Sequence, residues 1–182
     1  MKHLIIIPGI GDDHPIYHAG AAIFRLFGFR THIPVFGWNG NPASYQQRMD
    51  TLNQLIAELD SPVYLLGVSA GGPVAVSALT KNSDKIVKIA TLCSPLARFS
   101  YPINPLLTVA IQQAEMDLEC LEASQKRRIL SVHGIHDHVV PVKLSQPAGI
   151  RAVTIPSIHH GANIFLGLTI FIAPLLRFLK QR

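Results

Sequence analysis

The chain has 182 residues, of which 48% are hydrophobic and only 15% are charged, against the ~25% charged residues of an ordinary globular protein; this composition favours one domain with a large buried core. Lysine and arginine outnumber aspartate and glutamate by 16 to 11, but only Lys126, Arg127 and Arg128 are adjacent, so no basic stripe predicts nucleic-acid binding. Two cysteines, Cys93 and Cys120, exclude a disulfide framework and favour a reducing, cytoplasmic compartment.

Neither end of the sequence predicts a signal peptide or a membrane-spanning helix. The N-terminal stretch MKHLIIIPGIG has four apolar residues before its proline, which is short for a signal peptide and typical of a first strand. Residues 161–176 carry no charge, but a spanning helix needs about 20 apolar residues and Pro174 interrupts this run. We expect a largely buried helix there, with membrane contact or a dimer interface as the alternatives.

Apolar runs and helix-like segments alternate along the whole chain. This alternation predicts a mainly parallel sheet of about six strands in a three-layer sandwich, with helices on both faces, in a single α/β domain over residues 1–182. Ligands of such sheets bind beyond the carboxyl ends of the strands. The expected elements are strand 3–7, helix 17–27, strand 31–36, helix 43–60, strand 63–66, helix 70–80, strand 86–92, helix 105–124, strand 129–133, strand 152–155 and helix 161–180.

The segment GVSAGG places a serine directly after the strand expected at 63–66. Gly67, Ser69 and Gly71 form the pattern G-x-S-x-G between a strand and a helix, which is the setting of a nucleophile elbow. The serine of such a turn has a strained backbone, so the residues two before and two after it must lack bulk. A glycine-rich turn without chemistry has the same pattern, and a nucleophile also needs a base and an acid.

Two further strand ends supply such residues. Asp137 follows the strand 129–133 in HGIHDHVVP, and the pair His159 and His160 follows the strand 152–155. The chain order serine, aspartate, histidine is the order expected of α/β-hydrolases. Together with LIIIPGIG and IPSIHHGANIF, these motifs make the chain resemble a small α/β-hydrolase-fold protein over essentially its whole length.

The resemblance implies a shortened α/β-hydrolase sheet without the usual first two strands, and a Ser-His-Asp triad of Ser69, His160 and Asp137. The histidine of this family often follows a proline in the pattern P-x-x-x-H, which favours His160 from Pro156, with His159 as the alternative base.

The resemblance also implies two backbone donors for an oxyanion, the N–H groups of Ala70 and of Ile10. The family often has His-Gly in the loop after the first strand, whereas this chain has Pro8 and Gly9.

The polar residues around these motifs do not predict a metal centre. The histidines of residues 133–138 have the spacing H-x-x-H-D-H, which differs from the H-x-H-x-D-H pattern of metallo-β-lactamase-like hydrolases, so we expect neither a metal nor a cofactor. Asp12, Asp13 and His14 precede Pro15 and are interpreted as the cap of the following helix, with a place at the mouth of the site as the alternative.

The segment 94–128 has room for one loop and one helix but not for the cap domain of larger hydrolases, which predicts an open site. We expect a serine hydrolase that cleaves a carboxylic ester or thioester, in a small molecule or in an acyl group presented by a carrier. The alternatives are an acyltransferase with the same triad and a non-catalytic binding protein of this fold, at a membrane through the C-terminal helix. The sequence predicts neither the acyl chain nor the oligomeric state.

Overall fold

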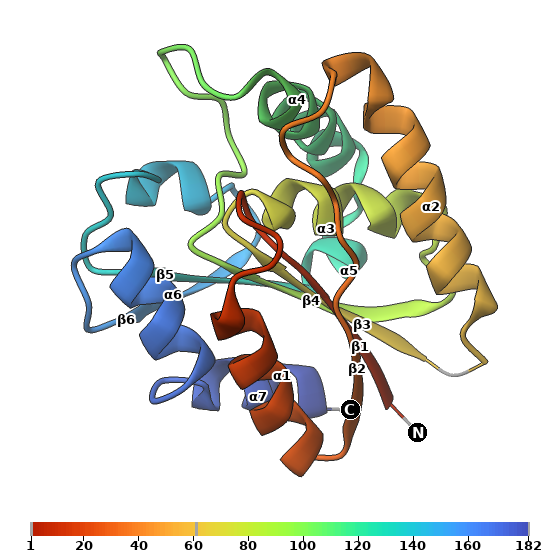
Figure 1. Cartoon of the computed structure of the whole chain (residues 1–182), viewed down its shortest axis with the longest axis vertical. Helices are drawn as coiled ribbons and strands as arrows, with labels where there is room; N and C mark the ends of the chain where they lie inside the picture. Colours follow the sequence, from red (N-terminus) through yellow and green to blue (C-terminus); the bar gives the residue numbers. More distant parts are fainter. Residues whose placement is uncertain (1, 61, 182) are drawn as a thin grey trace.

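The computed structural model describes residues 2–60 and 62–181. Its centre is a six-stranded parallel sheet with the order β2-β1-β3-β4-β5-β6, which confirms the predicted fold class (Figure 1). Strands that are consecutive in the chain are adjacent in the sheet, except β2 and β3, which lie on either side of β1. The strands are β1 (Lys2–Ile7), β2 (Phe29–His32), β3 (Val63–Val68), β4 (Ile86–Leu92), β5 (Ile129–Gly134) and β6 (Arg151–Ile155).

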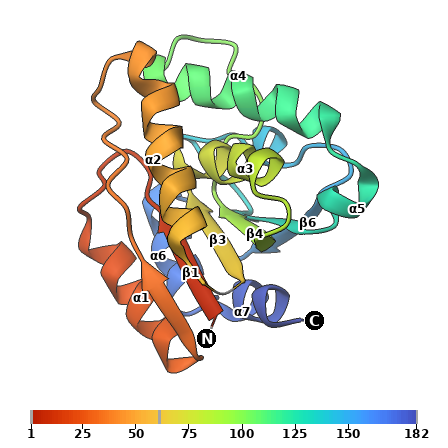
Figure 2. The ribbon, with the colours of Figure 1, turned by 90° about the vertical axis from the view of Figure 1, so that its right-hand side faces the viewer.

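Helices cover both faces of the sheet. Helices α2, α3 and α4 pack on one face, and α1, α6 and α7 pack on the other (Figure 2). The helices are α1 (Pro15–Leu26), α2 (Tyr45–Glu58), α3 (Gly71–Lys81), α4 (Pro105–Cys120), α5 (Ala123–Lys126), α6 (His160–Leu168) and α7 (Ala173–Lys180), with short 3-10 turns η1 (Pro42–Ser44) and η2 (Val142–Ser145).

The strands are apolar on both sides because both sides are covered. Side chains alternate between the faces of a strand, so Ile5 and Ile7 of β1 contact the layer of α2, α3 and α4, while Leu4 and Ile6 contact the layer of α1, α6 and α7. All four are fully buried. The continuous apolar run in the sequence of β1 is thus typical of a sheet that has helices on both faces and no solvent-exposed face.

Three segments differ from the elements expected. The helix expected at 105–124 is two helices, α4 and α5, because the backbone of Leu121 is extended and ends α4. The strand expected at 31–36 is found at Phe29–His32, because Pro34 has no N–H for a strand ladder and residues 33–36 continue unpaired. The helix expected at 161–180 is two helices, α6 and α7, bent by 54°. Pro174 lies in the first turn of α7, where its missing N–H removes no helical hydrogen bond.

Within residues 2–60 and 62–181, no single helix combines the length and the apolar composition that a membrane crossing requires. The pair α6 and α7 meets both criteria only when its two bent helices are counted together.

Candidate active site

Ser69, Asp137 and His160 come together at the carboxyl edge of the sheet. Ser69 follows β3, Asp137 follows β5, and His160 is the first residue of α6 after β6. The Ser69 Oγ lies 3.0 Å from the His160 Nε2, and the His160 Nδ1 lies 2.7 Å from the Asp137 Oδ2. His159 is exposed instead and packs against His138, with 4.6 Å between the ring centroids and 47° between the ring planes. The three side chains therefore form one hydrogen-bonded series in which His160, not His159, is the middle member.

The backbone turn that carries Ser69 is tight, as Gly67 and Gly71 on its two sides predict. Ser69 has a left-handed backbone with φ +50°, which is uncommon for a residue other than glycine. A Cβ on Gly67 would lie 2.5 Å from the Gly72 Cα, and one on Gly71 would lie 2.1 Å from the carbonyl oxygen of Ile7. Helix α3 begins two residues after Ser69, so its positive dipole end favours negative charge at this place.

The Asp137 carboxylate is buried, and both of its oxygens accept hydrogen bonds. Its Oδ1 accepts from the amides of Val139 and Val140 at 3.0 and 2.8 Å, and its Oδ2 accepts from His160. Burial by itself raises the pKa of Asp137, but hydrogen bonds from His160, Val140 and Asn163 and the charge of His160 outweigh it, and the pKa lies below its ordinary value. An ionised Asp137 places the imidazole proton on Nδ1 and leaves Nε2 to accept from Ser69.

Asn163 also holds the Asp137 carboxylate, although the motifs do not single it out. This fully buried side chain donates through Nδ2 to the Asp137 Oδ2 at 3.2 Å and to the carbonyl oxygen of His136 at 3.1 Å. It lies three residues after His160 on α6, so both side chains lie on the same side of the helix. Its spacing of three residues from the candidate histidine is visible in the sequence, but that spacing does not by itself predict the contact with Asp137.

The loop after β1 is fixed by two aromatic side chains from other segments. The Trp38 Nε1 donates to the carbonyl oxygen of Pro8 at 3.1 Å, and the Gly9 amide donates to the Tyr17 hydroxyl at 3.1 Å. Burial raises the pKa of Tyr17, so the hydroxyl is neutral at this place. Trp38 and Tyr17 are both buried, and neither belongs to a recognisable motif.

The polar residues of the same loop have two different partners. Helix α1 is capped by His14, whose Nδ1 accepts from the Ile16 amide at 3.3 Å, as expected. Asp12 is not part of this cap, and that expectation was wrong. Its carboxylate accepts from the amides of Phe36 and Gly37 at 3.3 and 2.7 Å, which ties the loop after β1 to the segment after β2.

The amides of Ile10 and Ala70 make no hydrogen bond to any described residue. Both lie beside Ser69, since Ile10 lines the same cavity as Ser69 and Ala70 follows Ser69 directly. The two loops touch, because a Cβ on Gly9 would lie 2.8 Å from the Ser69 Cβ and 3.4 Å from the Ala70 nitrogen. Two backbone donors without internal partners are therefore available next to the Ser69 hydroxyl.

A cavity of 410 Å³ opens beside Ser69 and His160. Its wall is mainly apolar and comes from the loop after β1, from α1 and from α6, and its rim is partly exposed, with Ile10 55%, Phe165 51% and Val139 45% accessible. The lining residues are Ile10, His14, Ile16, Tyr17, Ser69, Val139, His160, Gly161, Ile164 and Phe165.

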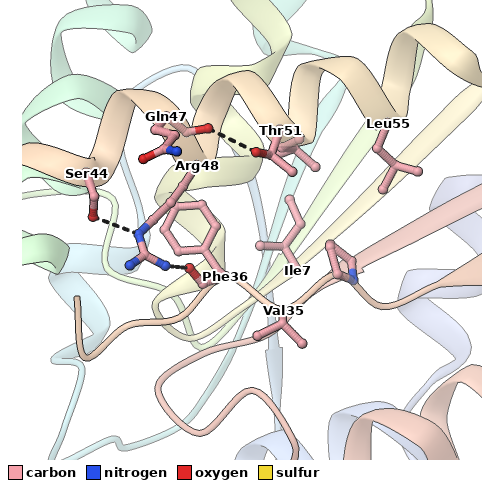
Figure 3. Close-up of a pocket in the computed structure, with 10 residues that line it drawn as sticks. Ile7, Val35, Phe36, Ser44, Gln47, Arg48, Thr51 and Leu55 are labelled. Carbon is pink, nitrogen blue, oxygen red and sulfur yellow. Dashed lines mark hydrogen bonds between the residues drawn. The ribbon is translucent and has the colours of Figure 1, made fainter. Parts of the chain in front are cut away.

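A second cavity, of 320 Å³, lies between α2 and residues 34–36 (Figure 3). Arg48 reaches across it, with hydrogen bonds to the carbonyl oxygen of Phe36 and to the Ser44 hydroxyl. Arg48 thereby fixes the segment that leads to Trp38, and this is how the residues of the second cavity support the site.

Across the described ranges, no cluster of three or more histidine, cysteine, aspartate or glutamate side chains is placed to hold a metal ion.

Comparison by sequence gives no relative: no protein-family model matches the chain, and no curated protein does. Solved structures do match. A monoacylglycerol lipase of Paleococcus ferrophilus aligns over 97% of this chain and 93% of its own, with a TM-score of 0.75 and 13% identity. Est1E of Butyrivibrio proteoclasticus aligns over 98% and 86%, with a TM-score of 0.69 and 17% identity. A pyrethroid hydrolase of Sphingobium faniae JZ-2 aligns over 97% and 96%, with a TM-score of 0.70 and 14% identity. The chain is thus similar to these enzymes in fold, and it is a small α/β-hydrolase-fold protein, as its motifs predict.

Proposed function

We propose that this α/β-hydrolase-fold chain is a serine hydrolase that cleaves a carboxylic ester or thioester through an acyl-enzyme. The observation that carries the proposal is the series Ser69, His160 and Asp137, joined by distances of 3.0 and 2.7 Å at the wall of an apolar cavity. The similar structures include a lipase and a pyrethroid hydrolase, whose names support ester cleavage as the reaction class.

In the proposed reaction the Ser69 Oγ attacks the carbonyl carbon while the His160 Nε2 takes its proton. Asp137 holds the Nδ1–H of the imidazole and stabilises the imidazolium that forms. The imidazolium then gives its proton to the leaving alkoxide or thiolate as the carbon–oxygen or carbon–sulfur bond breaks. Water attacks the acyl-enzyme and passes a proton to His160. His160 then returns this proton to the Ser69 Oγ as the bond between the Oγ and the acyl carbon breaks, and the carboxylic acid leaves.

The oxyanion of each tetrahedral intermediate would accept hydrogen bonds from the amides of Ile10 and Ala70. Their lack of partners among the described residues supports this role, because a donor that is already bonded would have to be released first. Loss of one such donor typically costs ~10²–10³ in turnover. Trp38 and Tyr17 would act as positioning residues, since they fix the loop that carries Ile10.

The cavity supports a substrate with an uncharged, apolar part. Ile16, Ile164 and Phe165 line it, and no carboxylate or lysine does. Between β4 and β5 the chain forms only α4 and α5, with no inserted cap domain. Such a site would accept a small ester or an acyl chain that is presented by a carrier.

The proposal is tested by labelling with a fluorophosphonate and by hydrolysis of p-nitrophenyl esters of increasing chain length. Wild type should label and hydrolyse, Ser69→Ala should do neither, and His160→Ala should lose activity by about 10⁴-fold or more. His159→Ala is the matched control and should keep most of the activity. Folded wild type that neither labels nor hydrolyses any ester of the series would favour the non-catalytic binding protein instead.

A further inference from the structure

One side of the molecule is built from sequence without carboxylates. No aspartate or glutamate occurs in residues 14–49 or in residues 138–182. These two stretches include α1, β2, β6, α6 and α7, besides η1, η2 and the start of α2, and the helices α1, α6 and α7 lie together on one face of the sheet (Figures 1 and 2). We call the outer surface of α1, α6 and α7, with the adjoining start of β6, the α1–α7 face.

Exposed cations lie on the α1–α7 face. Arg25 is in the last turn of α1, Arg177 and Lys180 are on α7, and Arg151 begins β6. The Lys180 Nζ lies 5.5 Å from the ring centroid of Phe27, which brings the ends of α7 and α1 together. Arg151 and Arg177 line one small cavity of 260 Å³. Among the described residues, none of these four cations has a carboxylate within 4.0 Å.

Large apolar side chains are exposed on the same face. Leu26 at the end of α1 is 85% accessible, Ile170 between α6 and α7 is 69% accessible, and Phe165 on α6 is 51% accessible. Exposed apolar groups interspersed with arginine and lysine, without carboxylates, are the composition of a surface that lies in the boundary layer of an anionic membrane.

We propose that the α1–α7 face binds the surface of an anionic lipid bilayer. A nucleic acid would complement the cations alone, whereas an anionic bilayer complements both the cations and the exposed Leu26 and Ile170. The cavity beside Ser69 lies at the carboxyl ends of the strands, where the first turn of α1 and the start of α6 line it. Arg25 in the last turn of α1 and Arg151 at the start of β6 lie toward the amino ends of the strands, so the proposed membrane contact is separate from the cavity.

The test is co-sedimentation of the full chain with phosphatidylcholine vesicles that contain or lack phosphatidylserine, at low and at high salt. Wild type should sediment with the anionic vesicles only, and less so at high salt. A cation near such a surface strengthens binding about fivefold, so Arg177→Gln with Lys180→Gln should weaken it about 25-fold. Leu26→Ser with Ile170→Ser should weaken it about tenfold. The matched control, Lys81→Gln with Arg98→Gln, removes two exposed cations beside α3 and α4, in the opposite helical layer, and should bind like wild type.

Three outcomes would overturn the proposal. These are absence of wild-type binding to the anionic vesicles, equal weakening in the control variant, and tighter binding of a fluorescent oligonucleotide that depends on Arg177 and Lys180 but not on Leu26. All substituted side chains are exposed, and circular dichroism verifies that each variant is folded. Ser69→Ala should bind vesicles like wild type, so the membrane result does not depend on whether Ser69 is a nucleophile.

Discussion

Replacement of Asn163 by leucine probes how the Asp137 carboxylate is held. Leucine has a similar volume but cannot donate to the Asp137 Oδ2 or to the carbonyl oxygen of His136. A hydrogen bond to a charged group is worth about 1.5–3 kcal/mol, and one to a neutral carbonyl about 1 kcal/mol. The substitution also removes the Asn163 Oδ1, which is buried without a partner among the described residues; this removal regains about 1–3 kcal/mol. The free energy of unfolding should therefore fall by only about 1–2 kcal/mol.

The substitution should also lower kcat, because it changes how the Asp137 carboxylate is held. After the change, the Asp137 Oδ1 still accepts from the amides of Val139 and Val140, so the carboxylate loses one of four donors and reorients in part. If about half of the 1.5–3 kcal/mol of the hydrogen bond to the Asp137 carboxylate is lost in the transition state, the barrier rises by about 1 kcal/mol, which is about a fivefold fall in kcat. KM should change little, because Asn163 does not line the 410 Å³ cavity.

The assay is the separate measurement of kcat and KM for a p-nitrophenyl ester, beside a urea unfolding curve. Asn82→Leu is the matched control, because Asn82 also donates two hydrogen bonds, to Asn53 and to the Ala78 carbonyl, at the far edge of the sheet. It should lose similar stability at unchanged kcat. An unchanged kcat in Asn163→Leu, or an equal fall in Asn82→Leu, would refute the positioning role of Asn163.

Two further predictions concern the loop after β1 and the pH dependence of stability. Trp38→Phe leaves the carbonyl oxygen of Pro8 without its donor, so kcat for the same ester should fall about tenfold or more while KM changes little; an unchanged kcat would exclude Trp38 as a positioning residue. His3 and His32 share a hydrogen bond of 2.9 Å, and the pKa of each is lowered, chiefly by burial. The unfolded chain therefore binds more protons, and the stability should be full above about pH 6.5 and decrease as the pH falls below it. Thermal unfolding monitored against pH should show this decrease in wild type and a smaller one in His32→Gln; equal slopes would contradict the assignment.

The positions of Ser69, Asp137 and His160 could be predicted because each depends on local sequence. A strand followed by a polar residue fixes where that residue lies, and parallel strands bring their carboxyl ends to one edge. Trp38, Tyr17 and Asn163 could not be predicted in this way. Their partners depend on how segments distant in sequence pack, as for Trp38 and the carbonyl oxygen of Pro8, 30 positions apart.

The element boundaries failed where tertiary contacts decide between extended conformations. Residues 33–36 have the apolar composition of a strand, but their segment leaves the sheet after His32. There it is bonded by the Asp12 carboxylate and by Arg48 rather than by a strand ladder. Pro34 marks in the sequence where the strand ladder ends, but no periodicity predicts the hydrogen bonds of this segment with Asp12 and Arg48.

Helix α6 contains nine residues, and it carries the imidazole of His160, the amide of Asn163 and the cavity wall at Ile164 and Phe165. A substrate too bulky for the cavity would displace this short helix and, with it, the His160 Nε2 from the Ser69 Oγ. Selection by size would then act on kcat rather than on affinity. In the proposed ester hydrolysis, substitutions at Ile164 or Phe165 that enlarge the cavity would therefore shift the preferred ester and the turnover rate together.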